Sequence, residues 1–437
     1  MRAPFALAAL LIAFPLQAQE SAFKPLVDKA ITAEVGDLEK LYLHLHAHPE
    51  IAFQEVETSA RLASELKKLG FEVTTKVGTT GVVGVFKNGP GPTILVRTDM
   101  DALPVTEKTG LPYASKVRIR DKEGRDVGVM HACGHDIHMT CWVGAARVLT
   151  QLKDSWKGTL VFIGQPAEEI GSGARRMLED GLYTRFPRPD FCLGLHASPL
   201  TPAGLITYSE GLMMANVDTV DILVRGKGGH GAAPHLTIDP IVLAARIVID
   251  LQTLRSREID PIEGAVVTVG AIRGGTKHNV IPSEVLLQLT VRSFKDSVRK
   301  HLLEGIERIS KAAAMSARAP EPTVTVSETE FTPALYNNPE LTKKVTGVFR
   351  SNFGDANVKA MPPIMGGEDF ARYAKDGTPI FFWFLGTMDQ KRWTESKKEG
   401  AAPLPSMHSE FYYPAPEPSI RHGVASMSLA VLDLLKK

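Results

Sequence analysis

The chain has 437 residues, 44% of them hydrophobic and 23% charged, and its 50 Lys and Arg residues nearly balance its 49 Asp and Glu residues. A formal net charge of +1 supplies no basic field, so nucleic acids and anionic membranes are not expected as partners and a small-molecule ligand is favoured. Three cysteines are too few for a disulfide scaffold in a chain of this length, and the size suggests about two or three domains.

The N-terminus has the pattern of a secretory signal peptide. Arg2 precedes an apolar run that ends at Pro15, and the following LQA, which ends at Ala18, fits a cleavage site. The run is shorter than the roughly 20 apolar residues that a membrane-spanning helix needs. We therefore expect residues 1–18 to be removed and the mature protein to be exported, either to the periplasm or out of the cell.

Three short apolar runs, each followed by polar residues, predict buried strands of a mixed, largely parallel sheet. The runs lie in TILVRTDMDALP, GTLVFIGQPAEE and DFCLGLHASP, with helical patterns at 136–151 and 171–181. Continuous apolar runs bounded by Gly and Pro are typical of strands covered on both faces by helices, which indicates an α/β fold. Ligands gather at the carboxyl ends of such strands, so one cleft is expected there. The polar residues that follow the runs are Asp99 and Asp101, Glu168 and Glu169, and His196.

A segment of different character interrupts this pattern. Residues 214–330 read as strand, helix, strand, strand, helix and strand, which is the order of the ferredoxin-like α+β unit. Because domain termini often lie close together, such a unit can be inserted into a larger chain. We therefore expect a metal-binding catalytic domain made of residues 19–213 and 331–437, with residues 214–330 as an inserted lid or dimerisation domain.

The sequence HACGHDIH suggests a metal site in an exported chain that has at least one unpaired cysteine. Cys133 and His135 offer a thiolate and an imidazole, which bind divalent transition metals, beside a predicted helix N-terminus that favours the thiolate. Taken alone, the pattern fits a core cysteine beside surface histidines equally well. The polar residues at the strand ends, and His408 in SMHSEF, favour the metal site. If Glu169 binds metal, Glu168 is free to act as general base on water.

Eight motifs occur in the order found in one enzyme family. They are RTDMDALP, MHACGHDIHM, GQPAEE, LGLHASP, VRGKGGHGAAPH, GGTKHNVIP, GGEDFA and MHS. With them, nearly the whole mature chain resembles the amidohydrolase branch of dinuclear metallopeptidases, which includes hippurate hydrolases, bacterial N-acyl-amino-acid amidohydrolases and plant auxin-conjugate hydrolases. The resemblance implies hydrolysis of an N-acyl amino acid to a carboxylic acid and a free amino acid.

The resemblance also implies a set of metal ligands and a catalytic base. Two divalent metal ions per subunit are expected, either Zn, Mn, Co or Ni, with Cys133 bridging them. Glu168 would take a proton from the attacking water and later deliver it to the leaving amine. The metal ligands carried over by motif are Cys133, His135, Glu169, His196 and His408.

Further roles follow from the same resemblance. Asp101 is expected to orient a ligand imidazole, and Asp99 to bond only nearby backbone. His230 of the inserted domain is expected to stabilise the oxyanion in the partner subunit of a homodimer, the alternative being a histidine satisfied within its own turn. Asn279 and Arg292 are candidates for binding the substrate carboxylate, with structural roles as the alternative.

Other histidines and cysteines are not expected to bind metal. The tract HLHAHPE at 44–50 resembles a helix motif of the family that packs near the cleft. The others set aside are His138, His235 and His278, which at most line the site, and Cys141 and Cys192, which fit inert core thiols.

Two alternatives to the amidohydrolase stay open. A dipeptidase or carboxypeptidase of the same superfamily would use the same ligands, and a periplasmic solute-binding protein would share the export signal, the length and two α/β lobes. Glu168, a second carboxylate beside a metal ligand, favours an enzyme over a binding protein. The sequence departs from the family at HSEFYYPAPEPS, and at Gly366 and Gly367, where Gly-Ser is more usual. Both places lie where substrate walls are expected, so the acyl preference is not fixed.

Overall fold

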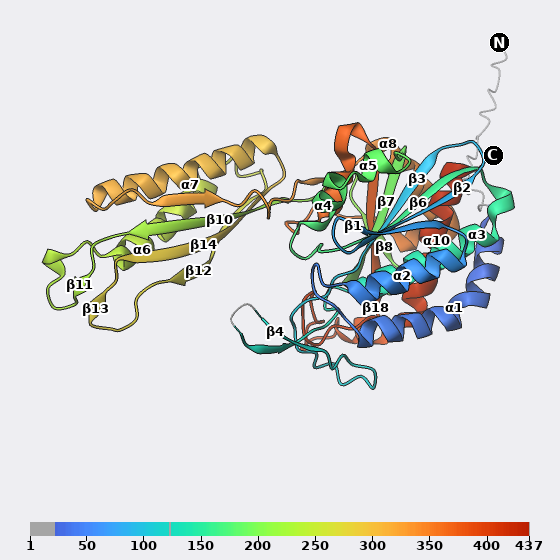
Figure 1. Cartoon of the computed structure of the whole chain (residues 1–437), viewed down its shortest axis with the longest axis horizontal. Coiled ribbons are helices and arrows are strands. Elements are labelled where there is room, and N and C mark those ends of the chain that lie inside the picture. The colour runs from blue at the N-terminus through green and yellow to red at the C-terminus, as the bar shows by residue number, and fades with distance from the viewer. Residues whose placement is uncertain (1–21, 122–123, 437) are drawn as a thin grey trace, which may run out of the picture.

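The computed structural model describes residues 22–121 and 124–436, and it has two lobes joined by a narrow connection (Figure 1). The predicted signal peptide, residues 1–18, lies outside the described residues. One lobe is built around a large sheet, and the other is formed by the middle of the chain. Among the described residues, no helix combines the length and apolar character needed to cross a membrane.

The larger lobe contains an eight-stranded mixed sheet in the order β1-β2-β6-β3-β7-β18-β8-β17. Neighbours β6, β3, β7 and β18 run parallel, whereas β1 with β2, β2 with β6 and β8 with β18 pair antiparallel. The α/β class and the largely parallel sheet expected from the sequence are therefore confirmed. The strands are β1 (Glu72–Val77), β2 (Gly81–Asn88), β3 (Thr93–Asp99), β6 (Gly158–Gln165), β7 (Phe191–Pro202), β8 (Ile206–Tyr208), β17 (Val358–Ala360) and β18 (Ile380–Met388).

Helices cover both faces of this sheet. Successive strand residues point to opposite faces, and accordingly Ile94 and Val96 of β3 belong to one core while Leu95 belongs to another. Burial on both faces explains why these strands are continuously apolar. The helices of the first core are α1 (Lys24–Ala47), α2 (Val56–Lys68), α3 (His135–Gln151), α8 (Pro339–Phe353) and α10 (Pro416–Leu435), and those of the second are α4 (Gly173–Glu179) and α5 (Leu182–Arg185).

The carboxyl ends of three neighbouring strands carry the polar residues that the sequence pointed to. Asp99 ends β3 and pairs with Gln165, which ends β6. His196 lies in β7, where it pairs with Phe384 of β18. Helix α3, which begins at His135, packs against both β3 and β7. One edge of the sheet therefore gathers these side chains, as expected.

The smaller lobe has a four-stranded antiparallel sheet in the order β12-β14-β10-β15, packed against two helices. Its chain order is the strand-helix-strand-strand-helix-strand order expected for residues 214–330, and its strand order is that of the ferredoxin-like unit. The elements are β10 (Asn216–Arg225), α6 (Pro240–Thr253), β12 (Ala265–Arg273), β14 (Glu284–Ser293), α7 (Asp296–Ser316) and β15 (Thr323–Val326). A short pair, β11 (Gly229–His230) with β13 (Val280–Ile281), lies at the far end of this lobe (Figure 1).

Two segments of the chain join the lobes side by side. Val217 and Thr332 exchange backbone hydrogen bonds in both directions, each with an N to O distance of 2.9 Å. Next to them, β9 (Gly211–Met214) pairs with β16 (Leu335–Asn337). The remaining short elements include the hairpin of β4 (Arg118–Arg120) and β5 (Asp126–Gly128), helix α9 (Gln390–Glu395) and the short helical segment η5 (Asp369–Gly377).

Candidate active site

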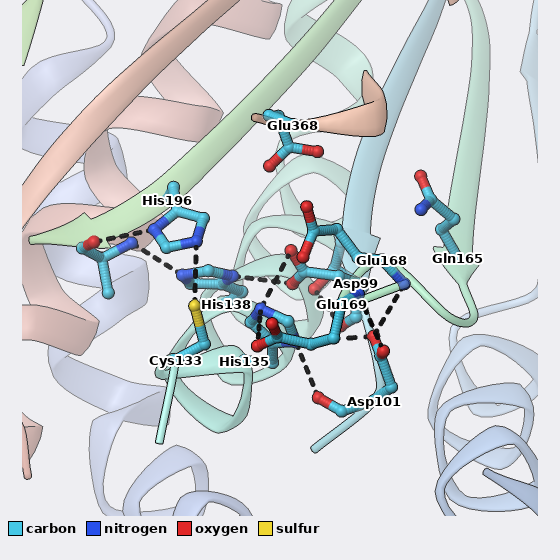
Figure 2. A network of polar contacts seen from close by, with 12 residues as sticks. Asp99, Asp101, Cys133, His135, His138, Gln165, Glu168, Glu169, His196 and Glu368 are labelled. Carbon is cyan, nitrogen blue, oxygen red and sulfur yellow. Dashed lines mark hydrogen bonds and ion pairs between the residues drawn. The ribbon is translucent and has the colours of Figure 1, made fainter. Parts of the chain in front are cut away.

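Donor side chains from separate parts of the chain meet at the carboxyl ends of the strands. The donor atoms of Cys133, His135 and His196 all lie within 4.8 Å of one another, and so do those of Cys133, Glu169 and His408. Cys133 Sγ is 3.5 Å from His196 Nε2, and His408 Nε2 is 3.4 Å from Glu169 Oε2. The structure thus brings together all five residues predicted as metal ligands, and Cys133 belongs to both groups. Figure 2 shows Cys133, His135, Glu169 and His196 among them.

Hydrogen bonds orient the two buried imidazoles so that Nε2 of each is left for the cluster. Nδ1 of His135 donates to the backbone oxygen of Asp101 at 2.7 Å, and Nδ1 of His196 donates to that of Ala197 at 2.8 Å. A carbonyl oxygen only accepts, so each Nδ1 carries a proton, and Nε2 is the nitrogen that the neutral ring offers to a metal. Nε2 of His135 and Oε1 of Glu169 are buried, lie 3.8 Å apart and make no hydrogen bond in the described part of the chain. Buried ligand atoms left without hydrogen bonds fit bound divalent cations.

Burial also shifts the protonation of these donors. It raises the pKa of the Cys133 thiol well above its ordinary value, raises that of Glu169 to about 7, and lowers that of His196. In each case burial penalises the charged form. A divalent cation favours the opposite outcome for the thiol and the carboxylate, since both bind it as anions. The arrangement therefore suits a metal better than it suits an empty polar cluster.

Asp101 fixes the turn that carries Glu168 and Glu169. Its Oδ1 accepts from the backbone N–H of Glu168 and its Oδ2 from that of Glu169, both at 3.0 Å. The hydrogen bond to the His135 ring, expected from Asp101, comes from its backbone carbonyl. Burial, with Glu368 nearby, raises the pKa of Glu168 well above its ordinary range. Figure 2 shows Glu368 facing Glu168 across the site.

A fully buried arginine anchors the carboxylates around Glu168. Arg97 donates to Asp99 at 2.7 Å and to Glu368 at 2.8 Å. The expectation that Asp99 bonds only nearby backbone is wrong, because Asp99 accepts from Arg97 and also from Nδ1 of His138 at 2.7 Å. Nε2 of His138 accepts from the Ala197 N–H at 2.7 Å, so neither nitrogen of this ring is free for a metal.

Sequence reasoning did not assign a role to Arg97 or Glu368, although both stand in motifs that mark the family, RTDMDALP and GGEDFA. An arginine inside an otherwise apolar buried strand was the available signal, because a buried charge needs a partner.

The 44–50 tract lies outside the cluster: His46 bonds Asp136 at 2.7 Å and Glu107 at 3.2 Å. Cys141 and Cys192 are buried free thiols in α3 and β7.

Two predicted site residues lie far from the cluster within one chain. His230 in β11 and Asn279 beside β13 are exposed at the far end of the smaller lobe (Figure 1). Gly231 N–H donates to the Asn279 backbone oxygen there at 2.9 Å. The prediction that His230 and Asn279 complete this site is therefore not met by a single chain, since the connecting strands carry both of them away from the sheet edge. His235 and His278 lie at the same end of the lobe and are also exposed.

Arg292 does lie at the site. Together with Cys133, Glu169, His196 and His408 it lines a cleft of about 890 Å³ between the lobes, and its Nη1 donates to the backbone oxygen of Met365 at 2.7 Å. Burial lowers the pKa of Arg292, which indicates that its charge is incompletely solvated. Apolar side chains also line the cleft, and we call them the apolar wall; they include Leu200, Met214, Met361, Ile364 and Phe384.

The sequence of this chain is similar to those of known proteins. A family model described as peptidase family M20/M25/M40 matches residues 95–403. Thermostable carboxypeptidase 1 of Saccharolobus solfataricus is 38% identical over 356 residues, which cover 80% of this chain and 85% of that protein. N-acetyl-L-cysteine deacetylase of Bacillus subtilis is 36% identical, covering 87% and 88%. Hippurate hydrolase of Campylobacter jejuni is 38% identical, covering 78% and 85%.

Two solved structures share the fold over nearly the whole chain. A protein from methicillin-resistant Staphylococcus aureus aligns with a TM-score of 0.79 at 33% identity, covering 94% of this chain and 100% of that one. A Bacillus subtilis protein, described as a dinuclear metal binding peptidase from the M20 family, aligns with a TM-score of 0.71 at 31% identity, covering 92% and 100%.

Proposed function

The chain belongs to the peptidase family M20/M25/M40 and is a metal-dependent hydrolase of amide bonds, and we propose that it cleaves N-acyl amino acids to a carboxylic acid and a free amino acid. Relatives named hippurate hydrolase and N-acetyl-L-cysteine deacetylase support this substrate class. The observation that carries the proposal is Glu168, a half-buried carboxylate that lines the cleft beside the five clustered donors and is not itself needed as one of them.

The five clustered donors would hold two divalent cations. A thiolate, a carboxylate and imidazoles accept Zn, Mn, Co or Ni, so the ligand set alone does not choose among these metals. Bound there, the cations would polarise the amide carbonyl and make water more acidic. The donors are Cys133, His135, Glu169, His196 and His408.

Glu168 performs the proton transfers. Its backbone N–H is fixed by Asp101, and burial with neighbouring carboxylates keeps a proton favourable on its side chain. Glu168 therefore accepts a proton from the attacking water and donates it to the nitrogen of the leaving amino acid. A pKa raised above the ordinary glutamate value suits this second task, since the group must hold the proton before it gives it up.

The cleft offers separate surfaces for the two halves of the substrate. The Arg292 guanidinium, which has donors left after its bond to Met365, is suited to the carboxylate of the amino acid. The apolar wall around Met361 and Ile364 is suited to an apolar acyl group. Gly366 and Gly367 line the same cleft, so their departure from the usual Gly-Ser affects this surface.

A second copy of the chain would complete the site. His230 and Asn279 lie at the far end of the smaller lobe, away from this chain's own cleft, which supports a role in the cleft of a partner subunit. Helix α6 exposes Val242 and Ile249, which are 57% and 69% exposed, and an apolar helix face of this kind favours association. We infer a homodimer formed through the inserted lobe, in which His230 stabilises the oxyanion of the other subunit.

The alternatives are distinguished by substrate. A carboxypeptidase or dipeptidase would use the same cluster, and the similarity to a thermostable carboxypeptidase keeps peptides in the test. Family membership as an amide hydrolase weighs against a solute-binding protein. The N-terminal sequence supports export to the periplasm or beyond the cell, with cleavage near Ala18.

The test is hydrolysis of hippurate, N-acetyl amino acids, an indole-acetyl amino acid and dipeptides by metal-loaded protein. We expect the wild type to release free amino acid from at least one N-acyl substrate. Glu168→Ala should lose this activity while still binding metal, and Cys133→Ala should lose activity together with metal. Preferred cleavage of dipeptides would support the peptidase alternative, and no cleavage of any substrate would contradict the proposal.

A further inference from the structure

The turn that carries Glu168 and Glu169 starts at a residue in an unfavourable backbone conformation. Ala167 has a φ of +50°, in the left-handed region that L residues other than Gly, Asn and Asp rarely adopt, and it is fully buried. Its conformation decides the direction in which the next two side chains leave the strand end. Unless the surroundings hold it, Ala167 would favour a negative φ and the turn would open differently.

Two buried carboxylates hold three consecutive N–H groups of this turn. Glu55 Oε1 accepts from the Ala167 N–H at 2.9 Å, and Asp101 accepts from those of Glu168 and Glu169, each at 3.0 Å. We call Glu55 and Asp101 the carboxylate clamp. Side-chain oxygens thus accept from all three N–H groups, so the clamp is well suited to maintain a strained turn.

Glu55 comes from a distant part of the chain. It lies immediately before α2, 112 residues from Ala167, and its side chain reaches the turn through the core, with no exposed surface. Its other oxygen, Oε2, accepts from the Thr80 hydroxyl at 2.6 Å. No arginine, lysine or histidine in the described part of the chain pairs with Glu55, and Asp101 adds repulsion. A buried carboxylate without a cationic partner is unfavourable for folding, which points to a role outside stability.

The far end of the turn is also fixed. The Ala167 carbonyl accepts from Ser172 and Gly173, at 3.2 and 3.1 Å. A Cβ on Gly173 would lie 1.5 Å from the backbone oxygen of Pro166, so only glycine allows this close return of the chain. The turn is therefore closed upon itself, and its orientation relative to the sheet is set by the carboxylate clamp.

We propose that Glu55 is a positioning residue, which holds Ala167 in the left-handed conformation and thereby aims Glu168 at the reacting amide and Glu169 at the metals. The proposal rests on the proposed function for Glu168 and on the metal cluster for Glu169. Because Glu169 is included, metal affinity reports on the positioning independently of catalysis.

The test compares Glu55→Ala with Glu55→Gln, which keeps an acceptor for the Ala167 N–H while its amide group donates to the Thr80 hydroxyl. The substrate is hippurate, or N-acetylcysteine if only that is cleaved. We expect the kcat of Glu55→Ala to fall by about tenfold or more, because a misplaced catalytic group causes losses of this order, and the KM to change little. Its dissociation constant for Zn²⁺ or Mn²⁺ should rise about tenfold or more. The kcat and the metal dissociation constant of Glu55→Gln should both stay within about threefold of the wild-type values, because glutamine keeps an acceptor for the Ala167 N–H.

A second variant tests the backbone argument. Glycine adopts a positive φ without the steric penalty of alanine, so adding Ala167→Gly to Glu55→Ala should restore part of kcat and of metal affinity. The matched control is Glu65→Ala, which removes another buried carboxylate from helix α2, where it pairs with Arg147 at 2.8 Å and does not touch the turn. It should lower stability and leave kcat and metal affinity unchanged.

Three results would overturn the proposal. If Glu55→Gln lost as much kcat and metal affinity as Glu55→Ala, the charge of Glu55 would be what the site needs, and not the hydrogen bond that it accepts from the Ala167 N–H. Failure of Ala167→Gly to restore either quantity would remove the backbone argument. Equal losses in Glu65→Ala would reduce the role of Glu55 to stability. If the wild type cleaves no substrate, the proposed function fails, and the metal affinities of the same variants still decide the role of Glu55.

Discussion

Nδ1 of His135 lies 2.7 Å from the backbone oxygen of Asp101, and this contact determines which nitrogen of the ring is available to a metal. The proton on Nδ1 is committed to the carbonyl, so Nε2 is the atom left to bind a metal. The same Asp101 receives the N–H groups of Glu168 and Glu169 on its carboxylate. One residue therefore sets the geometry on two sides of the cluster.

Removal of metal should destabilise the protein. A chelator is expected to lower the thermal unfolding midpoint, and Zn²⁺ or Mn²⁺ added back at about 100 times its dissociation constant should restore about 2.7 kcal/mol. His135→Ala should show a much smaller metal-dependent shift, because it removes a buried donor. Differential scanning calorimetry measures the unfolding midpoint of the wild type and of the variant with and without metal. If metal raised the midpoint of His135→Ala as much as that of the wild type, His135 would be excluded as a ligand.

The buried ion network around Arg97 should be costly to disrupt. Arg97→Met leaves Asp99 and Glu368 without their cation, and loss of one partner from a buried network typically costs about 3–5 kcal/mol. Urea unfolding should show this loss. The control is Arg421→Met, which breaks an exposed pair with Glu417 and should cost no more than about 1 kcal/mol. Equal effects of the two changes would contradict the assignment.

His46 should make stability depend on pH. Burial alone would lower the pKa of His46, but hydrogen bonds and ion pairs with Asp136 and Glu107 outweigh it and raise the pKa to about 9. An unfolded histidine titrates near about 6.5, so this contribution is fully present below about pH 6.5 and is lost as pH rises towards about 9. The loss amounts to at most about 3 kcal/mol. Urea unfolding of wild type and His46→Gln between these pH values should show a steeper decline for the wild type; parallel curves would refute this.

The apolar wall should decide the acyl preference. Ile364→Ala and Met361→Ala each remove half-buried side chains from the cleft. A lost apolar contact is worth about 1–3 kcal/mol, so kcat/KM for benzoylglycine should fall about tenfold or more, while that for N-acetylglycine changes less. Ile262→Ala, at a site 88% exposed on the other lobe, should change neither. Equal changes for both substrates would place the acyl group elsewhere.

His230 should act on the other subunit. His230→Ala and Glu168→Ala homodimers should each be inactive, because each lacks one group at every site. In mixed dimers one site regains both groups, so subunit exchange should restore about a quarter of wild-type activity. Size-exclusion chromatography first establishes the dimer. Absence of complementation in exchanged dimers would exclude action across the subunits.

Much of the fold could be predicted because its signals are local. The helix predicted at 136–151 is observed at His135–Gln151, and the continuous apolar runs of β3, β6 and β7 do form central parallel strands. Strand ends meet at one sheet edge by geometry, which is why the carboxylates and His196 were expected together. The order of elements in the inserted lobe followed equally from periodicity.

The parts that could not be predicted depend on distant pairs. Arg97 and Glu368 are 271 residues apart, and a single sequence carries no sign that they meet. The same holds for Glu55 and the Ala167 N–H, where neither residue type suggests a partner. Asp99 was assigned too small a role partly for this reason, since its partner His138 reaches it only when helix and strand are packed; its other partner, Arg97, is two residues away on the same strand, and this local contact was overlooked.

The paired backbones of Val217 and Thr332 have a consequence for protein engineering. Because the chain leaves the large lobe and returns to it through hydrogen-bonded neighbours, a two-residue hairpin could replace the whole inserted lobe without stretching the remainder. Excision would yield a miniature protein with the metal donors intact, and the same junction would accept a foreign module of similar end-to-end spacing. The large lobe could therefore carry different inserted domains at this one junction.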